Sequence, residues 1–564
     1  MLSIKEISYA SIVLNLTSVI FGIVYLLTPY TVMWDIAGII YLITLFNNIL
    51  LVFLSSIKLN KQNKLGGRLN LWGYFFLILV ILAMLGMFLG NFLYSVTYPP
   101  DFGANLGVFA LIYLSYFGLL AFGLFFAYLN IKHIKNSEVW EPKMGESTLI
   151  KKLIKIFAAI ICGVILFIGI DFALLTLFGT IFSFGELNAT LGMFVAQMDL
   201  FFVFLNLSIT VILLKLIDKQ RSPHGFYAVG IVGLVISGIL MAPLCVTPYS
   251  IDLAESDFAT AFGSNWRDNI PNNIENEFFL KTQFSIPEYF LGMVSDQYRV
   301  NANIQFYDAE GIQLYFDVYM PLVDGSTLPG NNSVMIRIHG GGWTAGDKGL
   351  ANMMQMNKYF AAQGYIVFDI QYGLHDEGDQ ILLTPEYVRG NFTVDDMVRH
   401  IGNFTKYLAL HAGEYNANLD SVFVSGGSAG GHLACAVGLG IASGNYSSTF
   451  GDNMTIKGLI PFYPGNGHPT RFGGSVELIN PDDYLVNASS PPCLIFQGVE
   501  DGIVHWSITQ DLKDAYTAAG NDKCAAIYLP LGGHASDLYF TGYYNQVFLY
   551  YMERFLYLCV NDHI

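Results

Sequence analysis

Residues 1–249 consist mainly of long apolar runs separated by short polar segments. Roughly 20 residues, each rising ~1.5 Å, are needed to cross ~30 Å of hydrocarbon. Seven runs are that long, near residues 8–28, 34–57, 70–93, 106–129, 156–182, 190–214 and 225–246. The first run has no obvious small-residue cleavage site and is soon followed by another, which favours a retained helix over a removed signal peptide. The pattern predicts an all-α transmembrane bundle of about seven helices.

Beyond Tyr249, short apolar runs alternate with clusters of Gly, Pro, Asn and Asp, which is typical of strands, turns and short helices. We therefore divide the chain into a seven-helix transmembrane domain (1–249), a lid or connector segment (250–298) and an α/β domain (299–564). Five aromatic residues of the connector are candidates for a lipid-facing lid, with packing against the catalytic core as the alternative. They are Trp266, Phe278, Phe279, Tyr289 and Phe290.

Composition and charge support this division. Of the 564 residues, 53% are hydrophobic and only 13% are charged, which is too apolar for a single soluble globule. Residues 1–249 hold 14 Lys and Arg against 10 Asp and Glu, whereas residues 250–564 hold 14 against 34. The strongly acidic second part should repel nucleic acids and anionic headgroups, so we expect a neutral or cationic substrate and no nucleic-acid partner.

The basic residues also predict an orientation. Apart from Lys5, every Lys and Arg of residues 1–249 lies in the connections that follow the second, fourth and sixth apolar runs. The positive-inside rule then places the N-terminus in the cytoplasm and, after an odd number of spans, the α/β domain outside. Six Asn-x-Ser/Thr sequons in that domain are compatible with export. They begin at Asn331, Asn391, Asn403, Asn445, Asn453 and Asn487.

Two acids, Asp171 and Asp199, lie within predicted spans. With the fifth and sixth spans antiparallel, both fall in the outer half of the membrane and could be neighbours. One interpretation is a polar pocket that opens toward the α/β domain. The other is a protonated pair that joins helices by hydrogen bonding.

The six cysteines are scattered and suggest buried free thiols, and the chain contains no CxxC or HExxH motif. We therefore expect neither a metal nor a cofactor.

A candidate nucleophile follows a β-branched, aromatic segment. Ser421-Val-Phe-Val runs into Gly426-x-Ser428-x-Gly430 and then into a small-residue, apolar segment. This order predicts a strand, a sharp turn and a helix, with glycines on both sides because the flanking backbone comes close. A lone Gly-x-Ser-x-Gly motif is weak, since a glycine-rich loop produces it by chance.

A second motif lies about 90 residues upstream, where the apolar run Ser333–Ile338 ends in His339-Gly-Gly-Gly342-Trp343. Three successive glycines expose backbone N–H groups, which can stabilise the oxyanion of an acyl-transfer intermediate by ~3 kcal/mol each. A strand that ends in this string before an elbow serine is specific for serine acyl transfer.

A serine needs a base and an orienting acid, which follow in the order acid then histidine in such chains. Asp501 follows the apolar run Pro492–Gly498, and His534 follows the run Ala525–Leu529. His534 can accept the Ser428 proton while Asp501 fixes its tautomer. Glu500 and His505 are the weaker alternatives for the acid and the base.

These motifs resemble the hormone-sensitive-lipase-like branch of the α/β-hydrolase superfamily, the H-G-G-G carboxylesterases and lipases, over about residues 299–560. The resemblance implies that residues 299–564 are the catalytic domain, with an α/β-hydrolase fold built on a mostly parallel, doubly wound sheet. It also implies oxyanion donors at Gly341, Gly342 and Ala429. Candidates for lining the substrate site are His339, Trp343, Gly427 and Tyr463. For His339 and His432, a structural role is the alternative: His339 would brace the glycine turn, and His432 would cap the helix after the serine. Gln371-Tyr-Gly-Leu374 and Gly427 depart from the usual family residues, which puts substrate preference in doubt.

We therefore expect a membrane-anchored serine hydrolase that cleaves carboxylic esters of a lipid or another acylated substrate, with the bilayer and the ester as its partners. The alternatives are a peptidase or a membrane transacylase on the same triad, or a non-catalytic ligand-binding ectodomain of a transporter or receptor.

Overall fold

The computed structural model describes residues 3–27, 31–58, 64–97, 102–135, 149–179, 186–349, 354–377 and 384–564. Some positions that the sequence assigned to spans or to basic connections lie outside the described residues. They are residue 28, Lys61, Lys143 and residues 180–182.

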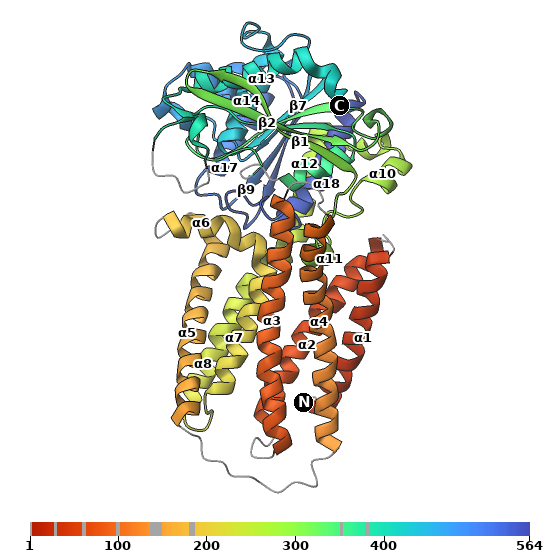
Figure 1. Cartoon of the computed structure of the whole chain (residues 1–564), viewed down its shortest axis with the longest axis vertical. Helices are drawn as coiled ribbons and strands as arrows, with labels where there is room; N and C mark the ends of the chain where they lie inside the picture. The colour runs from red at the N-terminus through yellow and green to blue at the C-terminus, as the bar shows by residue number, and fades with distance from the viewer. Residues whose placement is uncertain are drawn as a thin grey trace.

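Seven apolar spans confirm the predicted helical bundle. The first five are single helices, namely α1 (Ile4–Leu27), α2 (Thr31–Lys58), α3 (Lys64–Val96), α4 (Phe102–Lys135) and α5 (Leu149–Phe178). The sixth combines the end of α6 (Glu186–Val195), the 3-10 turn η3 (Ala196–Met198) and α7 (Asp199–Leu216), and the seventh combines α8 (Pro223–Leu240) and α9 (Ala242–Phe262). The helices stand side by side with the α/β domain at one end (Figure 1). All seven are long and apolar enough to cross a membrane.

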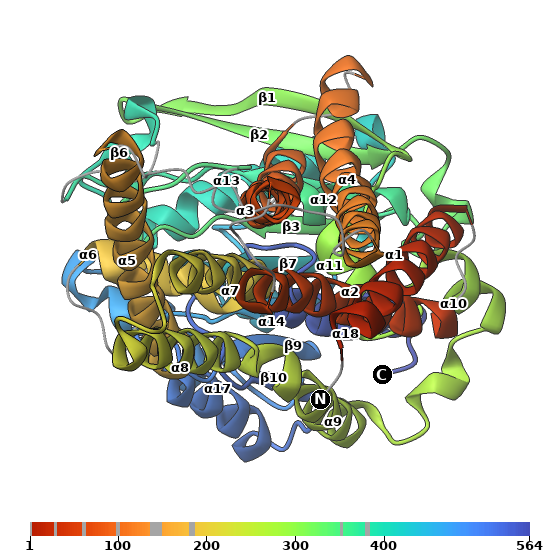
Figure 2. The same cartoon turned by 90° about the horizontal axis from the view of Figure 1, so that it is seen from below.

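Burial differs sharply among these helices. α7 is the most enclosed span, and α5 exposes many of its aliphatic side chains, as expected for a helix that faces lipid. The predicted boundary at residue 249 falls inside α9, which continues past Pro248 to Phe262. α9 then lies along the edge strand β10 (Cys524–Leu529), where the Asp257 carboxylate accepts a hydrogen bond from the Ala526 N–H at 2.6 Å. This contact covers part of an otherwise open sheet edge (Figure 2).

The second part of the chain contains an eight-stranded sheet in the order β1-β2-β4-β3-β7-β8-β9-β10. β2 runs antiparallel to both of its neighbours, β1 and β4, and all other neighbouring strands of this sheet pair in parallel. The bounds are β1 (Tyr298–Ala309), β2 (Ile312–Pro321), β3 (Ser333–Ile338), β4 (Ile366–Ile370), β7 (Asn418–Gly427), β8 (Ile456–Phe462) and β9 (Cys493–Gly498). A separate ribbon pairs β5 (Leu374–His375) with β6 (Arg389–Gly390).

Helices cover the sheet, as in a doubly wound domain. They are α12 (Met354–Ala362), α13 (Val394–Tyr415), α14 (Ala429–Ser443), α15 (Val476–Ile479), α16 (Pro481–Leu485), α17 (Trp506–Ala518) and α18 (Tyr543–Val560). The parallel β3, β4 and β7–β10 strands are buried almost throughout, which explains their continuous apolar runs. This arrangement confirms the α/β-hydrolase fold class.

The connector does not form a lipid-facing lid. It contains η4 (Trp266–Asn269), α10 (Asn272–Phe278) and α11 (Ile286–Leu291). Four of its five candidate aromatic residues are buried, and the fifth, Phe278, is half-buried, so the packing alternative describes them. The buried Arg554 of α18 holds the connector by an ion pair at 2.7 Å to Glu275 of α10, and it also pairs at 2.7 Å with Glu553, its neighbour on α18.

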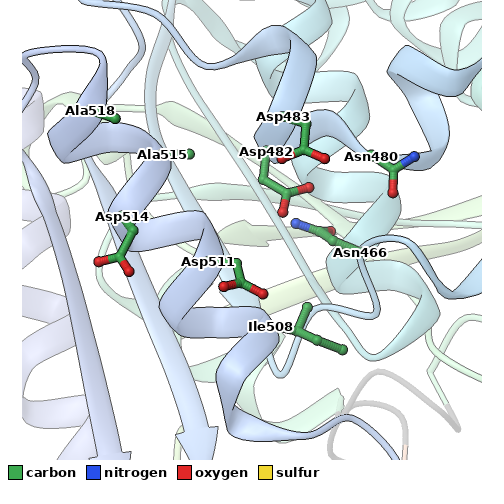
Figure 3. Close-up of a pocket in the computed structure, with 9 residues that line it drawn as sticks. All are labelled: Asn466, Asn480, Asp482, Asp483, Ile508, Asp511, Asp514, Ala515 and Ala518. Atoms are coloured by element: carbon green, nitrogen blue, oxygen red, sulfur yellow. The ribbon is translucent and has the colours of Figure 1, made fainter.

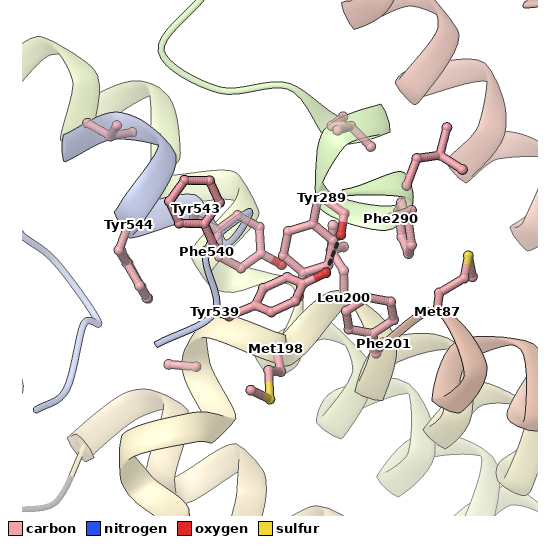
Figure 4. Close-up of a cluster of buried hydrophobic side chains, with 14 of the residues drawn as sticks. Met87, Met198, Leu200, Phe201, Tyr289, Phe290, Tyr539, Phe540, Tyr543 and Tyr544 are labelled. Atoms are coloured by element: carbon pink, nitrogen blue, oxygen red, sulfur yellow. Dashed lines mark hydrogen bonds between the residues drawn. The ribbon is translucent and has the colours of Figure 1, made fainter. Parts of the chain in front are cut away.

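The bundle and the α/β domain share one apolar core. Buried aromatic rings continue from α7 through α11 to the segment before α18 (Figure 4). Phe201 packs on Tyr289 with ring centroids 5.1 Å apart, and Tyr289 packs on Tyr543 at 4.9 Å. The Tyr539 hydroxyl also donates a hydrogen bond to the Tyr289 carbonyl oxygen. Side chains of the bundle, connector and hydrolase are therefore packed together and not merely linked by the chain.

The two intramembrane acids differ in environment. Asp199, in the first turn of α7, is fully buried and accepts a hydrogen bond from the Thr176 hydroxyl of α5 at 3.1 Å. Asp171 of α5 is half-buried. Asp199 thus joins α5 to α7 close to the α/β domain, whereas a functional pair with Asp171 stays a prediction.

Candidate active site

Ser428 occupies the sharp turn between β7 and α14. Its backbone has φ +57° and ψ −119°, a conformation that L-residues rarely adopt. The flanking positions have no room for a side chain. A Cβ added to Gly426 would lie 2.4 Å from the Ile338 carbonyl oxygen, and a Cβ added to Gly430 would lie 2.1 Å from the same oxygen. The Gly-x-Ser-x-Gly pattern therefore reflects close contact between this turn and the end of β3.

Three loops bring Ser428, His534 and Asp501 together. His534 Nε2 lies 3.1 Å from Ser428 Oγ, and His534 Nδ1 lies 2.7 Å from Asp501 Oδ2. The other Asp501 oxygen accepts hydrogen bonds from the N–H groups of Ile503 and Val504, both at 2.8 Å. With both carboxylate oxygens occupied, the His534 tautomer consistent with the network carries its proton on Nδ1 and accepts the Ser428 hydroxyl proton at Nε2.

The two rival residues are directed elsewhere. His505 is exposed and caps α17, with its Nδ1 2.9 Å from Ser507 Oγ. Glu500 is half-buried, and burial raises the pKa of its carboxyl. Its backbone packs against Gly179 at the end of the fifth span, since a Cβ added there would lie 1.9 Å from the Glu500 carbonyl oxygen. Neither residue is hydrogen-bonded to His534 or Ser428, and the two ring nitrogens of His534 face Asp501 and Ser428.

The glycine string lies beside the serine. A Cβ added at Gly340 would lie 3.5 Å from Ser428 Cβ, and Gly341 and Gly342 have φ values of +124° and +63°. Within the described ranges, the backbone N–H groups of Gly341, Gly342 and Ala429 donate no hydrogen bond to another protein group. Unpaired N–H groups next to a nucleophile are suited to hold a developing oxyanion.

The remaining candidate residues brace this site. His339 is buried, its Nδ1 lies 2.8 Å from the Gly340 carbonyl oxygen, and its ring stacks on Tyr372 with centroids 4.5 Å apart. The Trp343 indole N–H donates to His432 Nδ1 at 3.2 Å. His432 Nε2 lies 2.8 Å from the Leu478 carbonyl oxygen, and burial lowers the pKa of His432 to about 4. His432 is thus a neutral structural residue.

Tyr463 contacts the hydrogen-bonded relay of Ser428, His534 and Asp501 directly. Its ring lies 4.6 Å from the His534 ring, and its hydroxyl donates to Asp537 Oδ1 at 2.6 Å. A side chain at residue 427 would crowd this hydroxyl, since a Cβ there would lie 2.9 Å from it, which explains why Gly427 stands where similar esterases have an acid. Asp537 is a buried neighbour of the site that the motifs did not reveal, although it lies only three residues after His534.

A cavity of about 440 Å³ lies between α16 and α17, away from the relay (Figure 3). Its lining is acidic, and burial together with Asp483 raises the pKa of the Asp482 carboxyl to about 6. The lining residues are Asn466, Asn480, Asp482, Asp483, Ile508, Asp511, Asp514, Ala515 and Ala518. Among the residues that the structure describes, no group of three or more His, Cys, Asp or Glu side chains could hold a metal ion.

Residues 316–464, which include the glycine string and Ser428, match the family model described as BD-FAE. The chain is 24% identical over 235 residues to the probable carboxylic ester hydrolase LipM of Mycobacterium tuberculosis. That alignment covers 37% of this chain and 51% of LipM, so the chain spans about half the length of this curated relative.

Solved structures similar to this chain include two esterases. Esterase B from Lactobacillus rhamnosis aligns with a TM-score of 0.39 and 19% identity, covering 48% of this chain and 89% of the esterase. Esterase 2 from Thermogutta terrifontis aligns with a TM-score of 0.35 and 21% identity, covering 46% of this chain and 92% of that esterase. Residues 316–464 are thus similar to the BD-FAE family, and they lie in an α/β domain that a bundle of seven apolar helices precedes.

Proposed function

We propose that this chain is a membrane-anchored serine carboxylesterase whose nucleophile is Ser428. The observation that carries the proposal is the position of His534. Its Nε2 is hydrogen-bonded to Ser428 Oγ, and its Nδ1 is hydrogen-bonded to the Asp501 carboxylate. A base held in one tautomer by a buried carboxylate is the arrangement that turns a serine hydroxyl into a nucleophile. The likeness to a probable carboxylic ester hydrolase supports the choice of an ester substrate.

In the proposed reaction, Ser428 Oγ attacks the ester carbonyl carbon as its proton passes to His534 Nε2. The negative charge on the carbonyl oxygen is held by the N–H groups of Gly341, Gly342 and Ala429. His534 then gives its proton to the leaving alcohol, and an acyl-enzyme on Ser428 remains. A water molecule, deprotonated by His534, attacks the acyl carbon, and the acid leaves as Ser428 regains its proton.

The direction of the site favours a substrate carried by the membrane. Ser428, Asp501 and His534 all follow the carboxyl ends of parallel strands, and that edge of the sheet faces the helical bundle (Figure 1). The loops of Asp501 and His534 pack on Gly179 and Gly192, which belong to the α5–α7 region. A neutral acyl ester dissolved in or lying on the bilayer suits both this position and the acidic domain.

The basic residues support an orientation with the N-terminus in the cytoplasm. Lys215, Lys219 and Arg221 lie at or just beyond the end of α7 that points away from the sheet. The positive-inside rule then puts the α/β domain on the outer side. Five of the six sequon asparagines are exposed there, all except Asn403.

The test compares the full-length wild type with Ser428→Ala and a matched control, Ser443→Ala, at the other end of α14. All three are reconstituted in zwitterionic vesicles and given p-nitrophenyl esters of short and long acids. We expect hydrolysis by the wild type and the control and a loss of at least 1000-fold for Ser428→Ala. Equal rates for Ser428→Ala and the wild type would overturn the proposal.

A further inference from the structure

The loop that carries His534 rests on the membrane bundle. Gly533 lies against α6, because a Cβ added at Gly533 would be 3.1 Å from the Gly192 carbonyl oxygen. Glu500, the residue before Asp501, packs in the same way on Gly179. These contacts are between backbones, so small movements of the α5–α7 region would be transmitted to the two loops that hold the base and the acid.

One buried side chain of the bundle reaches this loop with both ends of its amide. Gln197 lies in η3, between α6 and α7, and is fully buried. Its Nε2 donates to the Ala535 carbonyl oxygen at 3.1 Å, and its Oε1 accepts the Tyr539 N–H at 2.6 Å. The two bonds bracket the five residues that directly follow His534.

The bracketed segment needs such support. Ala535 has φ +56°, which is the left-handed region of backbone conformation. This conformation costs free energy for alanine, and it persists only where the surrounding structure holds it. The hydrolase itself contributes a bond from the Ser536 hydroxyl to the Gly533 carbonyl oxygen and the bond from Tyr463 to Asp537. The Ala535 carbonyl oxygen accepts the Leu538 N–H at 3.1 Å from within the loop, and Gln197 of the membrane domain supplies its second hydrogen bond, also at 3.1 Å.

Gln197 is also fixed in place. Its Nε2 contacts the Met193 carbonyl oxygen one turn earlier, and its own carbonyl oxygen accepts the Tyr289 hydroxyl at 3.0 Å. Tyr289 packs among the rings that join the bundle to the hydrolase (Figure 4). The amide is therefore presented to the loop from a rigid corner of the membrane domain.

We propose that Gln197 is a positioning residue for His534, so that the membrane domain completes the active site and does more than anchor it. This inference rests on the proposed function. It assigns a catalytic purpose to the α6–α7 corner: holding the imidazole within hydrogen-bonding distance of Ser428. A displacement of about 1 Å between reacting groups can cost roughly 100-fold in rate.

The test uses full-length Gln197→Leu, which keeps the volume and removes both hydrogen bonds, and Gln197→Glu, which keeps only the acceptor. The matched control is Gln355→Leu. Gln355 is also a buried glutamine that joins two parts of the chain, through its Nε2 bond to the Met293 carbonyl oxygen at 2.7 Å, but it does not touch the His534 loop. The measurements are kcat and KM for p-nitrophenyl butyrate and the rate at which a fluorophosphonate labels Ser428.

We expect Gln197→Leu to lower kcat and the labelling rate about 10-fold to 100-fold with KM within twofold of the wild type. Gln197→Glu should be intermediate, and Gln355→Leu should match the wild type per folded molecule. A purely structural role would lower the folded fraction of both leucine variants and leave kcat per folded molecule unchanged, which would overturn this inference alone. An inert wild type that does not label at Ser428 would overturn the proposed function and this inference together.

Discussion

The substitution Asp501→Asn tests the catalytic relay most sharply, because it changes one atom and preserves the shape of the side chain. Asp501 Oδ1 accepts the N–H groups of Ile503 and Val504, and Oδ2 faces His534 Nδ1 at 2.7 Å. In the variant, the amide oxygen should keep the two backbone donors, so the amide NH₂ must face His534. His534 Nδ1 then has to accept a hydrogen bond, and its proton moves to Nε2.

With the proton on Nε2, His534 donates toward Ser428 and can no longer accept the hydroxyl proton. In chymotrypsin-like proteases the same exchange lowers kcat by about 10⁴. We expect a loss of about 10³ to 10⁴ here, which is ~4 to 5.5 kcal/mol of transition-state stabilisation at ~1.36 kcal/mol per tenfold. KM for a short ester should stay within a few-fold, since Asp501 is fully buried.

The assay is steady-state hydrolysis of p-nitrophenyl butyrate by the reconstituted full-length chain. Glu500→Gln is the control, because it makes the same acid-to-amide change at the preceding residue without touching His534. If Asp501→Asn kept more than a tenth of the wild-type kcat, or if Glu500→Gln lost as much, the tautomer argument would be refuted.

Three further predictions concern the free energy of unfolding. In each case the measurement is the midpoint temperature of heat inactivation. Gly430→Ala should cost several kcal/mol, or prevent folding, because the new Cβ meets a carbonyl oxygen at 2.1 Å, whereas Gly413→Ala, in open space on a helix, should be neutral or stabilising. Arg554→Leu should cost ~3 to 5 kcal/mol by leaving Glu553 buried without its cation, and an unchanged midpoint would contradict this. The pKa of His432 falls from ~6.5 in the unfolded chain to about 4 in the folded one, so the unfolded chain takes up a proton first on acidification. Stability should therefore drop by ~3 kcal/mol from pH 6.5 to pH 4, and His432→Gln should flatten that slope.

Much of this architecture could be predicted because local patterns determine it. Seven apolar runs longer than a bilayer give seven helices whatever their partners, and the buried parallel strands are continuous apolar runs. The order of serine, acid and histidine along the chain follows from the topology of the fold, so the motifs alone selected the three side chains that meet. The glycines at 426 and 430 were interpreted correctly for the same reason, since their lack of a Cβ is a local requirement.

The contacts between distant parts of the chain could not be predicted in this way. A glutamine within an apolar run, such as Gln197, carries no signal that its amide brackets a loop 338 to 342 residues away. The connector aromatics were ambiguous because a buried face and a lipid-facing face have the same composition. Only the tertiary packing shows four of the five to be buried. The boundary at Tyr249 follows the end of the last apolar run, but α9 continues to Phe262, because the helix extends beyond its apolar part to pack on the α/β domain.

The central claim is that Ser428, His534 and Asp501 act as one relay. It is tested most directly by treating the reconstituted chain with a fluorophosphonate and identifying the modified residue by peptide mass spectrometry. The account predicts a single adduct on Ser428 that forms at least 100 times more slowly in His534→Ala and at an unchanged rate in His505→Ala. An adduct on another residue, or equal rates in the wild type and His534→Ala, would contradict it.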